Sequence, residues 1–324
     1  KAVQDVSVDN GFSLGEAAEL GRELLQEMGL DYGGAAMETD LIIREVTGFD
    51  RIHIMLNPDQ GIGQQLYEEI VRLLELRRST MPMAYVLGHR DFMGLDFYCE
   101  QGVLIPRSDT EVLVETVIEK LEAQEEKTGS QKPESLYGIE IGVGTGIISI
   151  SLLRHFSVLS MVAGDVNEVA IELARKNAAY ADEQIMEMQG EHVSISRRLS
   201  VIYSDIFQNI ESLRLYDADN HADLYDFIVS NPPYIRTDVI ETLMSDVKDF
   251  EPHSALDGMD DGLYFYRQIT DRGYDMIRPG GFVAFEIGFD QGEEVSELMK
   301  KRGYRDVEIR KDLAGLDRVV TGFR

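Results

Sequence analysis

The chain has 324 residues, 44% of them apolar, which is enough to bury one large core and a smaller second one. Its 31 basic and 59 acidic residues leave a formal net charge of −28, which repels phosphate backbones and disfavours a general nucleic-acid binder. A single cysteine, no apolar run near the ~18 residues that span a bilayer, and no apolar signal-peptide core in residues 1–10 predict a cytoplasmic protein without membrane contact.

Residues 11–79 carry only helical patterns. Ser13 and Glu16 have the spacing of a capping box, and apolar residues at helical spacing follow before Gly29. Two more such stretches end near Gly48 and at Arg78. We therefore predict an N-terminal helical domain, residues 1–80, whose apolar stripes pack its own core.

The pattern becomes strand-like from Tyr85 to Arg107, with glycines spaced along it, which predicts a β-hairpin connector over residues 81–107. Ser108 and Glu111 can form another capping box for a helix through Ile118, although this segment can equally line a substrate cleft. Strands and helices then alternate through residues 108–324. This alternation predicts an α/β fold with a doubly wound, mostly parallel sheet.

A short apolar strand at 137–141 runs into a glycine loop and an apolar helix, an order typical of nucleotide binding. Alternating glycines let the backbone approach a ligand closely. The Gly-x-Gly-x-Gly spacing and the preceding acid favour S-adenosylmethionine over a dinucleotide, because a carboxylate can neutralise the methionine ammonium but would repel a pyrophosphate. The candidate cofactor-binding residues here are Glu140, Gly142, Val143, Gly144, Thr145 and Gly146.

Two further acids end predicted strands. Asp165 follows the apolar run 158–164, at the distance from the glycine loop where a carboxylate reaches ribose hydroxyls. Asp205 ends the third predicted strand, and Ile206 and Phe207 after it can flank an adenine ring. Each acid alone is more often a helix cap or a solvated carboxylate, but their successive placement at strand ends favours a cofactor site.

The most specific chemical signal is the run Asn231, Pro232, Pro233 and Tyr234, directly after a predicted buried strand at 225–230. An amide or aryl-amine nitrogen has its lone pair in conjugation, so a methyltransferase needs two acceptors for its two N–H bonds. The Asn231 side-chain oxygen and the Pro232 carbonyl can be those acceptors, since two prolines fix φ and supply no competing N–H. Tyr234 can stack on the flat target group. The alternative is a rigid turn without chemical importance.

Near the C-terminus, a strand is predicted from Phe282 to Ile287. Two more, around 307–310 and 318–323, are joined by a short polar link that predicts an antiparallel pair. The six histidines show no ligand spacing, so no metal site is expected.

The chain resembles the HemK/PrmC family of peptide chain release factor glutamine N5-methyltransferases over nearly its whole length. Besides the glycine loop and residues 231–234, the resemblance rests on residues 82–88, 91–95, 103–111, 251–252, 255–258, 261–263 and 311–320. It implies a class I S-adenosylmethionine-dependent methyltransferase domain over residues 108–324. It also implies cofactor contacts at residues 142–146, Asp165 and Ile206, and a substrate glutamine held by residues 231–234, with Asn231 touching both.

The chain departs from the family pattern at two positions. The family usually has Asp where this chain has Glu140, and often an aromatic residue where this chain has Ile206. The stretches 182–198 and 211–223 are also longer than usual, and we expect them to be surface excursions.

The expected mechanism is direct displacement at the sulfonium methyl by the glutamine side-chain nitrogen, without a covalent enzyme intermediate. An N6-adenine DNA methyltransferase is an alternative, because residues 231–234 also suit an exocyclic amine after base flipping, but no basic target-recognition segment is present. Two further alternatives are a glutamine methyltransferase that acts on a ribosomal protein and a non-catalytic cofactor-sensing or assembly protein. Residues 107–111 favour the release-factor branch.

Residues 231–234 alone cannot select one glutamine among many, so selection must use another surface. The helical domain and the hairpin connector are the available surfaces. The resemblance implies that the partner is a class I release factor and that its target glutamine lies in a Gly-Gly-Gln loop. From the acidic charge we expect no direct binding of nucleic acid.

Overall fold

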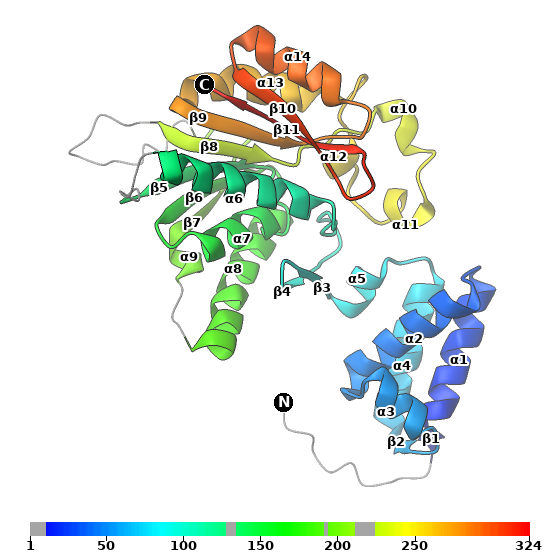
Figure 1. Ribbon diagram of the computed structural model, residues 1–324. Coiled ribbons are helices and arrows are strands. Elements are labelled where there is room, and N and C mark those ends of the chain that lie inside the picture. Colours follow the sequence, from blue (N-terminus) through cyan, green and yellow to red (C-terminus); the bar gives the residue numbers. More distant parts are fainter. Residues whose placement is uncertain (1–10, 128–133, 191–193, 211–223) are drawn as a thin grey trace. The chain divides into compact units, whose positions relative to one another are not determined.

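The computed structural model describes residues 11–127, 134–190, 194–210 and 224–324 (Figure 1). They form two compact units: a helical unit that ends at Gly88 and also includes Ser245–Phe250, and an α/β unit formed by His89–Met244 and Glu251–Arg324. The predicted surface excursion at 211–223 lies outside the described residues. No helix in the described ranges is long and apolar enough to cross a membrane.

The helical unit begins with a confirmed capping box. The Glu16 N–H donates to Ser13 Oγ at 3.2 Å, and the Ser13 N–H donates to Glu16 Oε2 at 2.8 Å. The second helix stops at Gly48, whose φ of 77° favours glycine and ends the helix. The elements are β1 (Phe12–Ser13), α1 (Leu14–Glu27), α2 (Tyr32–Thr47), α3 (Arg51–Leu56), β2 (Gly61–Ile62), α4 (Gln64–Arg78), α5 (Met83–Leu87) and α11 (Ser245–Lys248).

The core of this unit lies between α1, α2 and α4. Gly21 allows α1 and α2 to approach, because a Cβ there would lie 2.4 Å from Thr39 Cγ2. The guanidinium of Arg77 on α4 pairs with the Glu38 carboxylate on α2 at 2.7 Å, and both side chains are largely buried. The apolar helix faces therefore pack on one another, as the periodicity predicts.

The α/β unit contains one seven-stranded sheet in the order β10-β11-β9-β8-β5-β6-β7. Only β11 runs against the other strands, so the sheet is mostly parallel, as predicted. The predicted antiparallel pair at the C-terminus is confirmed. The strands are β5 (Leu136–Ile141), β6 (Leu159–Asp165), β7 (Leu199–Tyr203), β8 (Tyr225–Ser230), β9 (Ile277–Glu286), β10 (Arg305–Lys311) and β11 (Asp317–Phe323).

Helices cover both faces of this sheet (Figure 1). Alternation along a strand sends neighbouring side chains to different cores: Phe227 and Val229 pack with α6, α7 and α8, whereas Ile228 packs with α13 and α14. The helices are α6 (Thr110–Lys127), α7 (Ile147–His155), α8 (Glu168–Gln189), α9 (Ile195–Arg198), α10 (Thr237–Ile240), α12 (His253–Leu256), α13 (Tyr264–Met276) and α14 (Gly292–Arg302).

The hairpin is shorter than the predicted connector. It consists of β3 (His89–Phe92) and β4 (Leu95–Tyr98), joined at Met93 and Gly94, whose φ values of 48° and 73° suit a tight two-residue turn. The strand-like interpretation is wrong for Tyr85–Leu87, which belongs to α5 (Met83–Leu87); this helix ends at Gly88, with a φ of 81°. A five-residue apolar run has no period long enough to distinguish helix from strand.

The hairpin belongs to the α/β unit and is held on α8 by two side-chain amides. Asn177 accepts from the Tyr98 N–H at 2.9 Å and donates to the Tyr98 carbonyl at 3.1 Å. Gln184 accepts from the Asp96 N–H and donates to the Asp96 carbonyl, both at 2.8 Å. These bonds fix the backbone of β4 against the helix.

The stretch 182–198 is more than a surface excursion. Its described part extends α8 and forms α9, and Ile185 and Ile195 are fully buried. The Asp182 carboxylate caps α9 by accepting from the Ile195 N–H at 2.7 Å. Arg198 donates to three backbone carbonyls at 2.7–2.9 Å. The extra residues therefore add to the core.

Candidate active site

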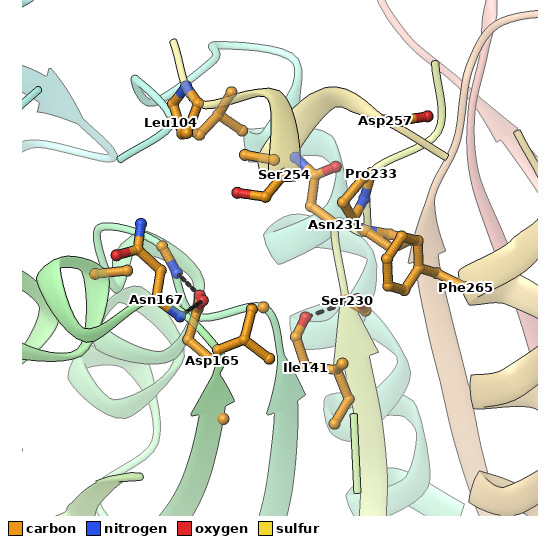
Figure 2. Close-up of a pocket in the computed structure, with 18 of the residues that line it drawn as sticks. Leu104, Ile141, Asp165, Asn167, Ser230, Asn231, Pro233, Ser254, Asp257 and Phe265 are labelled. Carbon is orange, nitrogen blue, oxygen red and sulfur yellow. Dashed lines mark hydrogen bonds between the residues drawn. The ribbon is translucent and has the colours of Figure 1, made fainter. Parts of the chain in front are cut away.

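A cavity of about 400 Å³ opens at the carboxyl ends of β5, β6, β7 and β8 (Figure 2). The strand order reverses between β5 and β8, and ligands of open α/β sheets bind at such a switch point. The cavity is lined from several segments: 102–104, Ile141, Gly142, Gly144, Gly164, 165–167, Ala170, 204–206, 230–233, 252–255, Asp257, Met259 and Phe265.

The glycine loop after β5 adopts a backbone that other residues rarely accept. Gly142, Gly144 and Gly146 have φ values of 77°, 51° and 86°. A Cβ at Gly146 would also lie 3.0 Å from Ile150 Cδ1 and 3.3 Å from Ala174 Cβ. Glycine is therefore needed for the turn itself as well as for ligand approach. Gly142 and Gly144 line the cavity, while Val143 and Thr145 are buried beside an adjoining hollow of about 40 Å³.

Asp165, at the end of β6, holds this loop. Its Oδ2 accepts from the Gly144 N–H at 3.0 Å, and its Oδ1 accepts from the Asn167 N–H at 2.9 Å (Figure 2). Burial raises the pKa of this carboxyl, and the backbone hydrogen bonds oppose the increase. Since each carboxylate oxygen keeps a further lone pair, Asp165 can accept from a ligand at the cavity wall.

Glu140 lies deeper than expected. It is fully buried and lines the smaller hollow together with Gly142, Gly144 and Asn231. Its Oε2 accepts from the N–H and the hydroxyl of Ser149, whereas its Oε1 has no hydrogen-bond partner among the described residues. Burial raises the pKa of this carboxyl to about 8. A cation beside Oε1 would satisfy the unpaired oxygen and favour the ionised form.

Ile206 and Phe207, the two residues after β7 that were expected to flank adenine, have different positions. Asp205 and Ile206 line the cavity, and Ile206 has a φ of 52°, which is unusual for a branched residue. Phe207 does not line it: the ring is buried in the core under α13 and α14, with the Arg272 guanidinium over its face. The irregular backbone after β7 turns the two neighbouring side chains in different directions.

Residues 231–234 follow β8 at the cavity wall opposite Asp165 (Figure 2). Asn231, Pro232 and Pro233 line the cavity. The Tyr234 ring packs instead against the core under α13 and α14, where burial raises the pKa of its hydroxyl to about 12. Tyr234 is not among the lining residues, and its stacking on a substrate stays a prediction.

One segment further along the chain, residues 255–258, holds this loop in place. Ile235 accepts at its carbonyl from the Gly258 N–H at 2.8 Å and donates its N–H to the Leu256 carbonyl at 3.0 Å. A Cβ at Gly258 would lie 2.8 Å from the Tyr234 Cα and 2.9 Å from the Pro233 carbonyl oxygen. Residues 255–258, one of the segments on which the family resemblance rests, therefore help to set the conformation of the loop formed by residues 231–234.

Glu286 is a site residue that the sequence analysis missed. It ends β9 and is 1% exposed, and the neighbouring side chains of Thr110 and Asn231 favour the ionised form of its carboxyl. Burial raises the pKa of its carboxyl to about 7. The sequence did contain a signal for Glu286, because it is an acid near the end of a predicted strand. The same pattern identified Glu140, Asp165 and Asp205.

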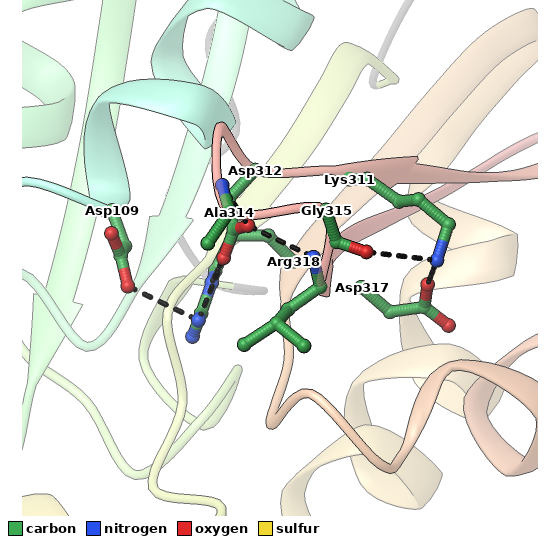
Figure 3. Close-up of polar contacts among 8 residues, drawn as sticks. Asp109, Lys311, Asp312, Ala314, Gly315, Asp317 and Arg318 are labelled. Carbon is green, nitrogen blue, oxygen red and sulfur yellow. Dashed lines mark hydrogen bonds and ion pairs between the residues drawn. The ribbon is translucent and has the colours of Figure 1, made fainter.

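The segment that carries Thr110 is tied to the C-terminal hairpin. Arg318 Nη2 lies 3.1 Å from Asp109 Oδ2 and 3.0 Å from Asp312 Oδ2 (Figure 3). Asp312 also accepts from the Ala314 and Leu316 N–H groups at 2.9 and 3.0 Å. Residues 107–111 and 311–320, both part of the sequence resemblance, thus form one contact. Within the described ranges, no group of His, Cys, Asp or Glu could hold a metal ion.

Two family models and several solved structures match parts of the chain. Residues 16–88 match the PrmC N-terminal domain, and residues 128–247 match the methyltransferase small domain. A solved structure of the human Mettl16 catalytic domain aligns over 80% of this chain and 82% of that chain, with 15% identity and a TM-score of 0.48.

Curated relatives match over nearly the whole chain. The release factor glutamine methyltransferase of Clostridium botulinum is 37% identical, over 89% of this chain and 92% of that protein. Those of Agrobacterium fabrum and Aquifex aeolicus are 34% and 33% identical, over 93% and 94% of this chain and 93% and 95% of the relatives. This chain belongs to the release factor glutamine methyltransferase family.

Proposed function

We propose that this protein transfers the methyl group of S-adenosylmethionine to the side-chain amide nitrogen of the glutamine in the Gly-Gly-Gln motif of a class I peptide chain release factor. The observation that carries the proposal is one cavity with Asn231, Pro232 and Pro233 on one wall and the glycine loop with Asp165 on the other. The relatives' names supply the substrate class.

The residues present fit this cofactor. Glu140 Oε1 is a buried acceptor with no partner in the described part of the chain, so it is available to a methionine ammonium. Asp165 offers carboxylate lone pairs for ribose hydroxyls. Ile141, Ile206 and Phe265 supply apolar cavity walls for an adenine ring. The bound cofactor would supply an electrophilic methyl on a sulfonium.

The protein's own residues hold the nucleophile. The Asn231 side-chain oxygen and the Pro232 carbonyl accept the two amide N–H bonds, which turns the nitrogen lone pair toward the methyl. The apolar cavity wall excludes water from the cationic donor. Rate enhancement therefore comes from positioning and desolvation, without a nucleophilic side chain.

The helical unit is the proposed docking surface for the intact release factor. It exposes large apolar side chains on α2 and α3: Met37, Leu41, Ile52, Met55 and Leu56 are 38–75% exposed. Three of them line a surface hollow of about 320 Å³, together with Asp40, Arg44, Asp50 and Arg51. An exposed apolar patch with a charged rim suits protein recognition.

Mass spectrometry after incubation with labelled S-adenosylmethionine tests the proposal. We expect one added methyl on the Gly-Gly-Gln glutamine of intact release factor, none on a release factor with alanine at that position, and far slower reaction of a short Gly-Gly-Gln peptide. Removing residues 1–80 should slow the reaction of the intact factor far more than that of the peptide. Equal rates on peptide and intact factor would refute docking, and methylated adenine in a duplex DNA control would refute the substrate assignment.

A further inference from the structure

Glu286 and Asn231 are brought together by strand register. Strand β9 runs parallel to β8, with Phe285 paired to Ser230. The residues that follow each pair, Glu286 and Asn231, therefore leave the sheet side by side at its carboxyl edge. Strand β11 pairs on the other side of β9, with Val319 opposite Glu286, and the Glu286 side chain is 1% exposed.

The hydrogen bonds around Glu286 have one direction. Asn231 Nδ2 donates to Thr110 Oγ1 at 3.3 Å. The Thr110 hydroxyl has a single hydrogen, and since its oxygen already accepts from Asn231, this hydrogen can point at the Glu286 carboxylate. The side chains of Thr110 and Asn231 both favour the ionised form of this carboxylate. An ionised carboxylate only accepts, so both neighbours must present donors to it.

This direction fixes which end of the Asn231 amide is available to a ligand. Its Nδ2 donates to Thr110, so Oδ1 is the atom left for the cavity that Asn231 lines. The proposed reaction needs an acceptor at this position. A donor there would face the N–H groups of the substrate amide and repel them.

We propose that Glu286, acting with the Thr110 hydroxyl, is a positioning residue that locks the Asn231 amide with Oδ1 toward the substrate nitrogen. The inference rests on the proposed function. It also explains why a carboxylate that is 1% exposed, with Oε2 unpaired among the described residues, is placed beside the substrate loop. Such buried groups are costly, and one that a fold retains calls for an explanation.

The lock works only while Glu286 is ionised, because a protonated carboxyl can donate to Asn231 Oδ1 and reverse the amide. Burial raises the pKa of Glu286 to about 7; Thr110, Arg318 and Asn231 oppose the increase, and Asp109 adds to it. Tyr234 and Tyr266 also face this carboxylate. Turnover should therefore decrease as the pH falls through about 7.

Substitution of Glu286 tests the lock in the full-length protein. We expect Glu286→Gln to reduce kcat about 10²-fold, the scale for a misplaced reacting group, and to change cofactor affinity less than twofold. The variant should also lose the decrease in kcat below pH 7. In an Asn231→Ala background the same substitution should have little further effect, since Glu286 acts through Asn231.

Thr110 gives a second, milder test if Glu286→Gln fails to fold. Thr110→Val removes the hydroxyl at nearly constant volume and should slow turnover, while Thr110→Ser keeps the hydroxyl and should restore most of it. Unchanged kcat in Glu286→Gln, multiplicative effects with Asn231→Ala, or equal rates for the two Thr110 variants would overturn the proposal. A wild-type protein without methyl transfer would instead refute the proposed function.

Discussion

The side-chain amide of Gln291 donates to the Tyr234 carbonyl at 3.1 Å, so a residue just before α14 holds the end of the loop formed by residues 231–234. The same amide donates to the Gly262 carbonyl at 3.2 Å and accepts from the Gly288 N–H at 3.0 Å. One buried side chain thus connects three backbone segments behind residues 231–234.

Replacing this side chain should loosen the loop. Gln291→Leu leaves three backbone groups without a partner, and we expect it to lower the free energy of unfolding by about 1–3 kcal/mol. It should also reduce kcat more than cofactor affinity. Denaturant titration and steady-state kinetics measure both effects. Glu293→Gln, at an exposed position of α14, is the matched control, and equal stability of the two variants would contradict the role of Gln291.

Asn231→Ala should reduce turnover by about 10²–10³-fold, because it removes one preorganised polar contact to the reacting amide. Cofactor affinity should change little, since the glycine loop, Asp165 and Glu140 are unaltered. Single-turnover rates and calorimetry with S-adenosylmethionine separate the two quantities. A variant with half the wild-type turnover would exclude this role for Asn231.

Asp165→Ala should act on the cofactor instead. It removes the carboxylate that accepts from the Gly144 and Asn167 N–H groups, and we expect S-adenosylmethionine binding to weaken by about 1.5–3 kcal/mol. Asp182→Ala is the control, because Asp182 also accepts from two backbone N–H groups but does not line the cavity. Unchanged cofactor affinity in Asp165→Ala would show that its contacts serve the loop alone.

Cofactor binding should release a proton from Glu140 at neutral pH. Its pKa of about 8 means that the carboxyl is mostly protonated at pH 7 in the free protein. A bound ammonium favours the ionised form, so the pKa falls on binding and the proton leaves. Because a proton is released, higher pH favours binding, and wild-type affinity should increase relative to Glu140→Gln between pH 6 and 8.

Calorimetry at pH 7 in two buffers with different ionisation enthalpies measures this proton directly. The wild type should release more protons per bound cofactor than Glu140→Gln does. Equal release by the two proteins would mean that the ammonium does not approach Glu140.

Elements whose signals are local could be predicted from the sequence. The capping box at Ser13 and the helix end at Gly48 depend on neighbours in the chain, and both are present. The alternation of strands and helices was enough to predict the parallel sheet, because each βαβ step buries its strand in the same way. The strand-end acids Asp165 and Asp205 follow from that sheet order, and the structure brings both to one cavity.

Features that depend on contacts far apart in the chain could not be predicted in this way. Glu286 meets Thr110 only because β9 pairs beside β8 and α6 begins at the same edge. Phe207 is buried in the core while Ile206 lines the cavity, and no sequence pattern predicts the φ of 52° that the branched residue Ile206 adopts. The segment Ser245–Phe250 joins the helical unit through tertiary contacts alone.

The side-chain amides of Asn177 and Gln184 make the hydrogen bonds to β4 that the backbone of a further strand would make. Each offers one acceptor and one donor to a residue of β4 whose backbone faces away from β3. An exposed strand edge normally invites another chain to add a strand. The backbone N–H and carbonyl groups of Asp96 and Tyr98 at this edge already have hydrogen-bond partners. A protein substrate that binds the hairpin here must therefore contact its side chains, because it cannot add a strand to the sheet.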